Sequence, residues 1–148
     1  MKKILSIGEA TIDCFVFLKD AEVRCHLNNA NCMLCIHYAD KILAEKLVFT
    51  VGGNAANTSV SFARLGLDSQ LYSVVGDDAN GRKILAALTK EGVDQGYIQK
   101  FAGTTSYSTA IVFQGERSLL IYHEPRDYLI PNLEPVDWVY LTSLGQNY

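Results

Sequence analysis

Short runs of apolar and β-forming residues recur along the chain and alternate with stretches whose apolar residues follow helical spacing. The runs that predict strands lie at residues 3–7, 14–18, 47–51, 69–75 and 136–144. Helices are expected between Asn54 and Gly66 and again before Gly92, because apolar residues recur there every three or four positions. The order strand, helix, strand predicts a parallel βαβ unit and therefore an α/β fold.

Two further β-rich runs lie at residues 107–113 and 118–122. They are joined by Gln114-Gly115-Glu116-Arg117. A short connection that contains glycine predicts an antiparallel hairpin, here with a four-residue loop.

The most informative stretch begins with Gly52-Gly53 and continues into a helix of small residues. Because glycine lacks a Cβ, the backbone there can take positive φ and let another group approach closely. Asn54 is expected to cap the helix, and Asn54 and Asn57 are expected to face the same side of its first turn. With the free backbone N–H groups they would form a concave polar spot suited to hydroxyls or an anion. An ordinary Gly-Gly turn before a helix is the alternative.

Aspartates follow two of the predicted strands. Asp13 lies beyond the carboxyl end of the first strand, where open α/β sheets bind ligands, and its carboxylate can accept hydrogen bonds from two sugar hydroxyls. The alternative is a turn aspartate that accepts from local N–H groups. Asp77 and Asp78 could be a metal-binding pair, but their place before the second helix favours a capping role for Asp78 or Asn80.

Residues 20–46 contain an unusual group of cysteines. The spacing Cys25-x6-Cys32-x2-Cys35-x-His37 supplies three thiolates and one imidazole, the ligand set of a tetrahedral zinc site. Only one close cysteine pair is present, whereas two pairs make the reliable zinc signature. The alternatives are cysteines that act as small apolar residues in a strand or helix, and a redox pair at Cys32 and Cys35.

Composition narrows the class of protein. The chain has 148 residues, of which 49% are apolar and 20% charged, and this is enough for one domain with a hydrophobic core. The net charge of −3 predicts no bulk attraction to nucleic acid or to an anionic membrane. No apolar run is long enough to span a bilayer or to serve as a signal peptide, so we expect a cytoplasmic protein with reduced cysteines.

Several blocks of the sequence, in this order, resemble the ribokinase/PfkB family of sugar and nucleoside kinases. The glycine stretch with its helix is similar to the family's first signature, and the opening strand with Asp13 is similar to its opening strand and substrate-binding aspartate. The matching blocks are Ile4–Asp13, Gly52–Asn57 with Arg64-Leu65-Gly66, Val74–Gly81 and Leu88–Asp94. Residues 20–46 depart from the family, in which a short hairpin is usual.

This resemblance implies a ribokinase-like α/β fold with a doubly wound, mostly parallel sheet and a small β-lid. Residues 1–148 would be the N-terminal part of a single domain, with the lid built from segments at about 14–20, 46–51 and 105–123. The family's catalytic Gly-Ala-Gly-Asp loop lies in its second half and does not occur in this chain. The ATP-binding half is therefore expected to be absent from it.

The resemblance also assigns roles to residues. It implies that Asp13 binds sugar hydroxyls, that Gly52 and Gly53 allow close backbone approach, and that Asn57 is a substrate-binding asparagine. Asn54 stands at a position that varies within the family. The complete protein would use ATP and Mg²⁺ to phosphorylate a hydroxymethyl of a sugar or nucleoside, and this chain alone would be inactive. Its lid would support a homodimer. The alternative is a short, non-catalytic protein that binds a sugar or dimerises through its lid.

Overall fold

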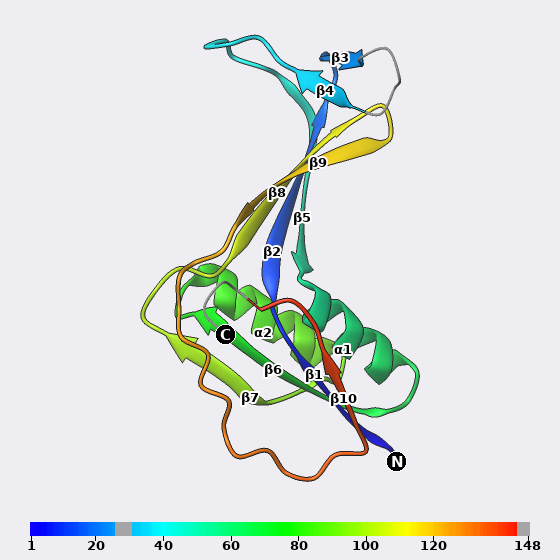
Figure 1. The fold of residues 1–148 in the computed structure, drawn as a ribbon, viewed down its shortest axis with the longest axis vertical. Helices are drawn as coiled ribbons and strands as arrows, with labels where there is room; N and C mark the ends of the chain where they lie inside the picture. Colours follow the sequence, from blue (N-terminus) through cyan, green and yellow to red (C-terminus); the bar gives the residue numbers. More distant parts are fainter. Residues whose placement is uncertain (26–30, 145–148) are drawn as a thin grey trace.

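The computed structural model describes residues 1–25 and 31–144 and contains two four-stranded sheets, a separate hairpin and two helices (Figure 1). The elements, in chain order, are β1 Lys3–Ile7, β2 Thr11–Leu18, β3 Glu22–Cys25, β4 Cys32–Cys35, β5 Ala44–Gly52, α1 Asn54–Arg64, β6 Asp68–Gly76, α2 Ala79–Lys90, β7 Asp94–Phe101, β8 Tyr107–Phe113, β9 Glu116–Tyr122 and β10 Trp138–Leu141.

The first sheet, called the core sheet here, has the strand order β10-β1-β6-β7, and all its neighbouring strands are parallel. Strands β1 and β6 are almost entirely buried, as their continuous apolar runs predict. The strand–helix–strand unit expected from residues 47–51, the first helix and residues 69–75 is wrong, because β5 lies in another sheet than β6. A parallel unit is formed one element later, where helix α2 connects β6 to its parallel neighbour β7. The structure thus confirms an α/β fold with a parallel sheet.

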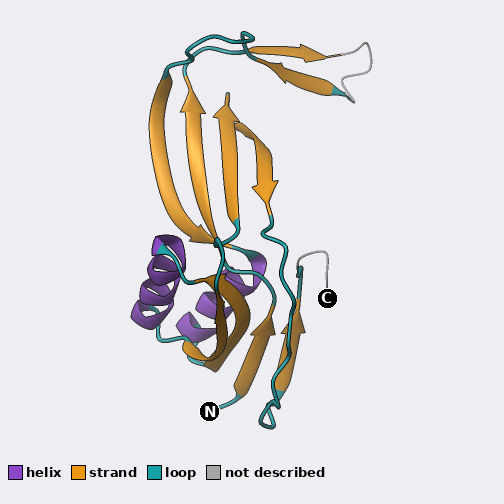
Figure 2. Ribbon diagram, turned by 90° about the vertical axis from the view of Figure 1, so that its left-hand side faces the viewer, coloured by secondary structure: helices purple, strands orange, loops and turns teal. Residues whose placement is uncertain are grey.

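The two faces of the core sheet are covered differently (Figure 2). Side chains of α1 and α2 pack on one face, where Ala55 and Ala56 let α1 approach closely and Leu71 of β6 lies beneath. On the other face, Leu5 and Tyr72 contact Tyr128 and other residues of the irregular segment 123–137. Both described helices therefore lie on one face of the core sheet.

The second sheet has the order β5-β2-β8-β9 and extends away from the core sheet (Figure 1). Strand β2 is antiparallel to β5 and parallel to β8, and β8 and β9 form a hairpin. The segments expected to build a lid lie in this sheet and its connections. The loop of the hairpin is shorter than predicted: Phe113 already pairs with Glu116, because positive φ at Gln114 and Gly115 allows a two-residue turn.

The ends of the helices follow local signals with one exception. Gly66 and Gly92 have φ of 81° and 74° after α1 and α2, as expected for left-handed helix ends. Asp78 caps α2 by accepting a hydrogen bond of 2.7 Å from the N–H of Gly81. The expected cap of α1 by Asn54 is wrong, because Gly53 occupies that position and Asn54 is already the first helical residue.

The cysteine-rich segment forms the small antiparallel hairpin β3–β4, which is a sheet of its own. Its register places Cys25 opposite Cys32, and the two form a disulfide. The candidate zinc ligands Cys25, Cys32, Cys35 and His37 thus do not offer three thiolates, because Cys25 and Cys32 are bonded to each other, and the described residues contain no cluster of three potential metal ligands. The expectation that all cysteines are reduced is wrong for the same reason, whereas Cys14 and Cys35 are free thiols.

Candidate functional site

Four chain connections cross between the core sheet and the second sheet, and the candidate site lies at the first two of them. Beyond β1, the N–H of Glu9 donates to the carbonyl of Ser143, at 3.0 Å. The N–H of the buried Ala10 donates to Oγ of Ser73 in β6, at 3.1 Å. These bonds hold the first connection at the carboxyl edge of the core sheet, the edge at which parallel sheets bind ligands.

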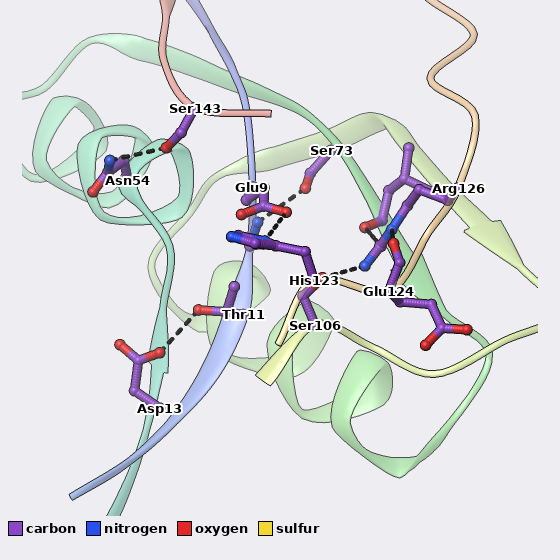
Figure 3. A network of polar contacts seen from close by, with 12 residues as sticks. Glu9, Thr11, Asp13, Asn54, Ser73, Ser106, His123, Glu124, Arg126 and Ser143 are labelled. Carbon is purple, nitrogen blue, oxygen red and sulfur yellow. Dashed lines mark hydrogen bonds and ion pairs between the residues drawn. The ribbon is translucent and has the colours of Figure 1, made fainter. Parts of the chain in front are cut away.

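Asp13 lies on β2, just after this connection, and is half-buried. Its Oδ1 accepts a hydrogen bond of 3.0 Å from the hydroxyl of Thr11 (Figure 3). In the second sheet Asp13 is paired with Thr50 on one side and Ser108 on the other. A Cβ added at Gly52 would lie only 2.0 Å from its Oδ2. The carboxylate therefore occupies space that exists only because residue 52 has no side chain.

Gly53 makes the second connection, between β5 and α1. Its φ of 90° lies in the region that side chains disfavour, and an added Cβ would meet the carbonyl oxygen of Glu9 at 2.3 Å. The N–H of Ala56 in the first turn of α1 donates to that same carbonyl, at 3.4 Å. The two glycines thus lie against different neighbours, Gly52 against the side chain of Asp13 and Gly53 against the backbone of Glu9.

The two asparagines of the glycine stretch have different surroundings. Nδ2 of Asn54 donates to Oγ of Ser143, just beyond β10, at 3.0 Å (Figure 3). Asn57 is exposed and lines a cavity of about 500 Å³ between α1 and α2. That cavity is bordered by Arg64, whose guanidinium donates two hydrogen bonds of 2.7 Å to Glu91. The structure therefore does not gather Asn54 and Asn57 into one polar spot.

The match to a family model spans almost the whole chain: the pfkB family carbohydrate kinase model covers residues 1–147. The chain belongs to the pfkB family of carbohydrate kinases.

Individual members of the pfkB family are moderately similar to the chain. Fructokinase-1 of Oryza sativa subsp. japonica is 35% identical over 97 residues, which cover 62% of this chain and 29% of that protein. Aminoimidazole riboside kinase of Salmonella typhimurium is 25% identical over 155 aligned positions, covering 98% of this chain and 40% of that protein. The chain thus spans well under half the length of these relatives.

A solved structure confirms the fold. The ribokinase of Cryptococcus neoformans var. grubii serotype A, in complex with ADP, superposes with a TM-score of 0.70 at 21% identity. The superposition covers 95% of this chain and 40% of that one. At this identity the likeness shows a ribokinase-like fold and no more.

Reasoning from sequence missed a polar pair at the site of this pfkB protein, formed by a buried glutamate and an exposed histidine. Glu9 is only 7% exposed, and its Oε1 lies 2.8 Å from Nδ1 of His123, the first residue after β9 (Figure 3). Glu9 could have been noticed as an acid directly after a buried strand. Nothing in the sequence marks His123, because its partner is 114 positions away.

Arg126 was also missed, and it fixes the fourth connection. Its side chain is buried, and its Nε donates to the carbonyl of Glu124 at 3.1 Å. The remaining nitrogens donate to the carbonyl of Val74 in β6 and to the hydroxyl of Ser106 before β8. The guanidinium also lies 4.7 Å from the centre of the Phe101 ring, a cation–π contact. One side chain therefore ties the segment after β9 to both sheets.

Asp78 stabilises the neighbouring connection between β7 and β8. Its carboxylate accepts hydrogen bonds from the N–H and the hydroxyl of Thr105, at 2.9 and 2.7 Å, in addition to the N–H of Gly81. Burial by itself would raise the pKa of Asp78, but these hydrogen bonds outweigh it and hold the pKa below its usual value. Capping, and not metal binding with Asp77, is the role that this geometry supports.

Proposed function

We propose that this chain is the acceptor-binding part of an ATP-dependent carbohydrate kinase, which transfers the γ-phosphoryl group of ATP to a hydroxymethyl of a sugar or nucleoside. Membership of the pfkB family supports the reaction class. The names of its relatives, a fructokinase and an aminoimidazole riboside kinase, support an acceptor of sugar or nucleoside type.

The observation that carries the proposal is the close contact of the Asp13 carboxylate with Gly52, at the end of the second sheet that joins the core sheet. An ionised carboxylate accepts hydrogen bonds only, and its two oxygens match two adjacent hydroxyl donors of a sugar. Oδ1 is already oriented by the hydroxyl of Thr11. Such preorganisation lowers the entropic cost of binding, so Asp13 is the residue that would orient the acceptor.

The other residues of the proposed site have supporting roles. Gly52 and Gly53 would let the acceptor lie close to the backbone that connects β5 to α1. Asn57 and Asn54 would contribute amide groups, with Asn54 placed at the edge of the site by Ser143. Because Asn57 lines the space between α1 and α2, its contact with an acceptor would require that space to be part of the complete site.

The second sheet would serve as a lid over the acceptor. Its four strands are hydrogen-bonded side by side, so it can act as one unit. The connections before β2 and β8 are short, whereas β5 leads into α1 and a longer segment follows β9. Closure of a lid excludes water and protects a phosphoryl donor from hydrolysis. The transfer itself depends on positioning and on charge stabilisation more than on covalent participation of the protein.

The described residues contain no cluster of three potential metal ligands. We place the main contacts to ATP and Mg²⁺ in a further part of the protein, because the chain covers only 29% to 40% of the length of these relatives. The proposal implies that this chain alone phosphorylates no sugar. It also places the protein in the cytoplasm, where reducing thiols would act on the Cys25–Cys32 disulfide.

The test is a screen of sugars and nucleosides with the complete gene product, with ADP formation as the readout. We expect turnover of at least one acceptor, and a rise in its KM of about tenfold or more in Asp13→Asn, which loses the charge-assisted hydrogen bonds. Asp20→Asn, an exposed aspartate beyond β2, is the matched control and should behave as the wild type. Absence of turnover with every acceptor, or an unchanged KM in Asp13→Asn, would contradict the proposal, as would turnover by this chain alone.

A non-catalytic role in dimerisation is the second candidate, and one feature of the second sheet favours it. Phe49 and Leu120 lie in one cross-strand row on the same face, and each is 60% exposed. Apolar side chains gathered on an exposed sheet typically mark an interface. Light scattering of the wild type and of Phe49→Glu would test it: a dimer that the substitution dissociates supports a lid-mediated homodimer, and a monomeric wild type contradicts it.

A further inference from the structure

The pair formed by Glu9 and His123 lies where the two sheets meet, beside the residues assigned above to the acceptor. Glu9 contacts both ends of the site through its backbone: its N–H donates to the carbonyl of Ser143, and its carbonyl lies against Gly53. Asp13 and its partner Thr11 follow on the same strand. Figure 3 shows the carboxylate of Glu9 and the imidazole of His123 between the Asn54–Ser143 pair and the Thr11–Asp13 pair.

The carboxylate of Glu9 is nearly enclosed, since its side chain is 8% exposed. Burial of a carboxylate is costly unless hydrogen bonds compensate for the lost water. Among the described residues, the hydrogen-bond partner of this carboxylate is Nδ1 of His123, at 2.8 Å. This hydrogen bond to Glu9, at the edge of the core sheet, fixes the direction in which the imidazole of His123 points.

The contact also determines which nitrogen of the ring can bind another group. An ionised carboxylate can only accept, so Nδ1 of His123 carries a hydrogen and donates the hydrogen bond to Oε1 of Glu9. In the neutral ring Nε2 is then a hydrogen-bond acceptor. The side chain of His123 is 39% exposed, and no hydrogen bond to Nε2 is formed by the described residues.

We propose that Glu9 orients His123 so that its Nε2 accepts a hydrogen bond from one hydroxyl of the acceptor, which makes His123 a specificity-determining residue and Glu9 its positioning residue. The inference rests on the proposed function, and it adds a hydroxyl contact to the one made by Asp13. Because His123 belongs to the end of the second sheet, the contact would form when that sheet lies over the acceptor. A pair that only held the two sheets together would affect every acceptor equally.

The experiment measures binding to the complete gene product by calorimetry, with D-fructose, D-ribose and the monodeoxy analogues of whichever sugar binds. We expect His123→Phe to weaken binding of the parent sugar about tenfold, in line with one lost hydrogen bond. For one monodeoxy analogue, the wild type and His123→Phe should bind equally, because that analogue lacks the contacted hydroxyl. The KM for ATP should not change.

Variants of Glu9 test its positioning role. Glu9→Gln keeps an oxygen that accepts from Nδ1 and should retain binding within about threefold of the wild type, whereas Glu9→Ala should approach His123→Phe. His37→Phe changes an exposed histidine beyond β4 and is the matched control. Near-ultraviolet circular dichroism of each variant confirms that it is folded.

The outcomes separate this inference from the function on which it rests. If the wild type binds no sugar, the proposed function fails and the inference with it. If the wild type binds but His123→Phe weakens the parent sugar and every monodeoxy analogue by the same factor, the inference alone is overturned. Equal binding by Glu9→Ala and the wild type overturns the positioning role of Glu9.

Discussion

The carboxylate of Asp13 occupies the space that any side chain at position 52 would need, since a Cβ built on Gly52 lies 2.0 Å from Oδ2 and 2.7 Å from Oδ1. The two residues belong to adjacent strands of the second sheet, β2 and β5. The glycine is therefore required by its neighbour and not by its own backbone conformation, which allows a separation of binding from stability.

Gly52→Ala should weaken acceptor binding with little effect on folding. Alanine is compatible with a strand, so we expect the free energy of unfolding to change by about 1 kcal/mol or less. The displaced carboxylate of Asp13 should raise the Kd of the acceptor about tenfold or more. Gly96→Ala in β7, where the added Cβ lies 3.3 Å from Asp94, is the matched control. Calorimetry and urea unfolding check both quantities, and equal binding by the two variants would contradict the prediction.

Gly53→Ala should instead damage folding. The substitution combines a φ of 90° with a clash of 2.3 Å against the carbonyl oxygen of Glu9, and a backbone atom cannot move aside cheaply. We expect a loss of about 3 kcal/mol in the free energy of unfolding. Gly66→Ala shares the positive φ, at 81°, but its Cβ would meet nothing within 4 Å, so it should cost only about 1 kcal/mol. If Gly53→Ala and Gly66→Ala lost the same free energy of unfolding in urea, the clash with the carbonyl of Glu9 would have to be relieved, which would contradict the prediction.

Asp78 should make the stability of the core sensitive to acid. Its pKa in the folded protein is lowered, since hydrogen bonds from Gly81 and Thr105 outweigh the effect of burial. The contribution of ionised Asp78 to the free energy of unfolding is therefore fully present above the pKa that the group has in the unfolded chain, about 4. This contribution is lost as the pH falls below that value.

Asp78→Asn should reduce stability by about 1–2 kcal/mol at pH 7 and should lose less further stability than the wild type below pH 4. Asp77→Asn, at the exposed neighbouring position, is the control and should follow the wild type. Urea unfolding between pH 7 and pH 3 measures the two profiles. Parallel profiles for the wild type and Asp78→Asn would refute this account.

The disulfide predicts how the cysteines react. In the protein purified without reductant, alkylation should label Cys35 quickly and the buried Cys14 slowly, and should leave Cys25 and Cys32 unlabelled until reductant is added. Mass mapping of the labelled peptides provides the readout. Metal analysis should find far less than one zinc ion per chain. Labelling of all cysteines before reduction, or stoichiometric zinc, would contradict the structure.

The buried strands and the helix ends could be predicted from the sequence, because each depends on residues that are close together in the chain. Continuous apolar runs set the buried strands β1 and β6, and glycines at the helix ends supply the left-handed conformation that terminates α1 and α2. Asp78 acts as a cap within the same short segment that it terminates. The position of Asp13 beyond β1 was also predicted, because the end of a buried strand in an α/β sheet can be recognised in the sequence.

Tertiary structure alone decided which side chains meet at the site. Asn54 seemed suited to cap its own helix, but its amide donates to Ser143, 89 positions later, because β10 lies beside β1 in the core sheet. The strand register paired Cys25 with Cys32, and the crossing of the chain between two sheets placed His123 against Glu9. The sequence determined periodicity, turns and helix ends, since these depend on backbone conformation within a few residues. Strand order and register bring distant polar groups within hydrogen-bond distance, so the chemistry of the site was settled only by the fold.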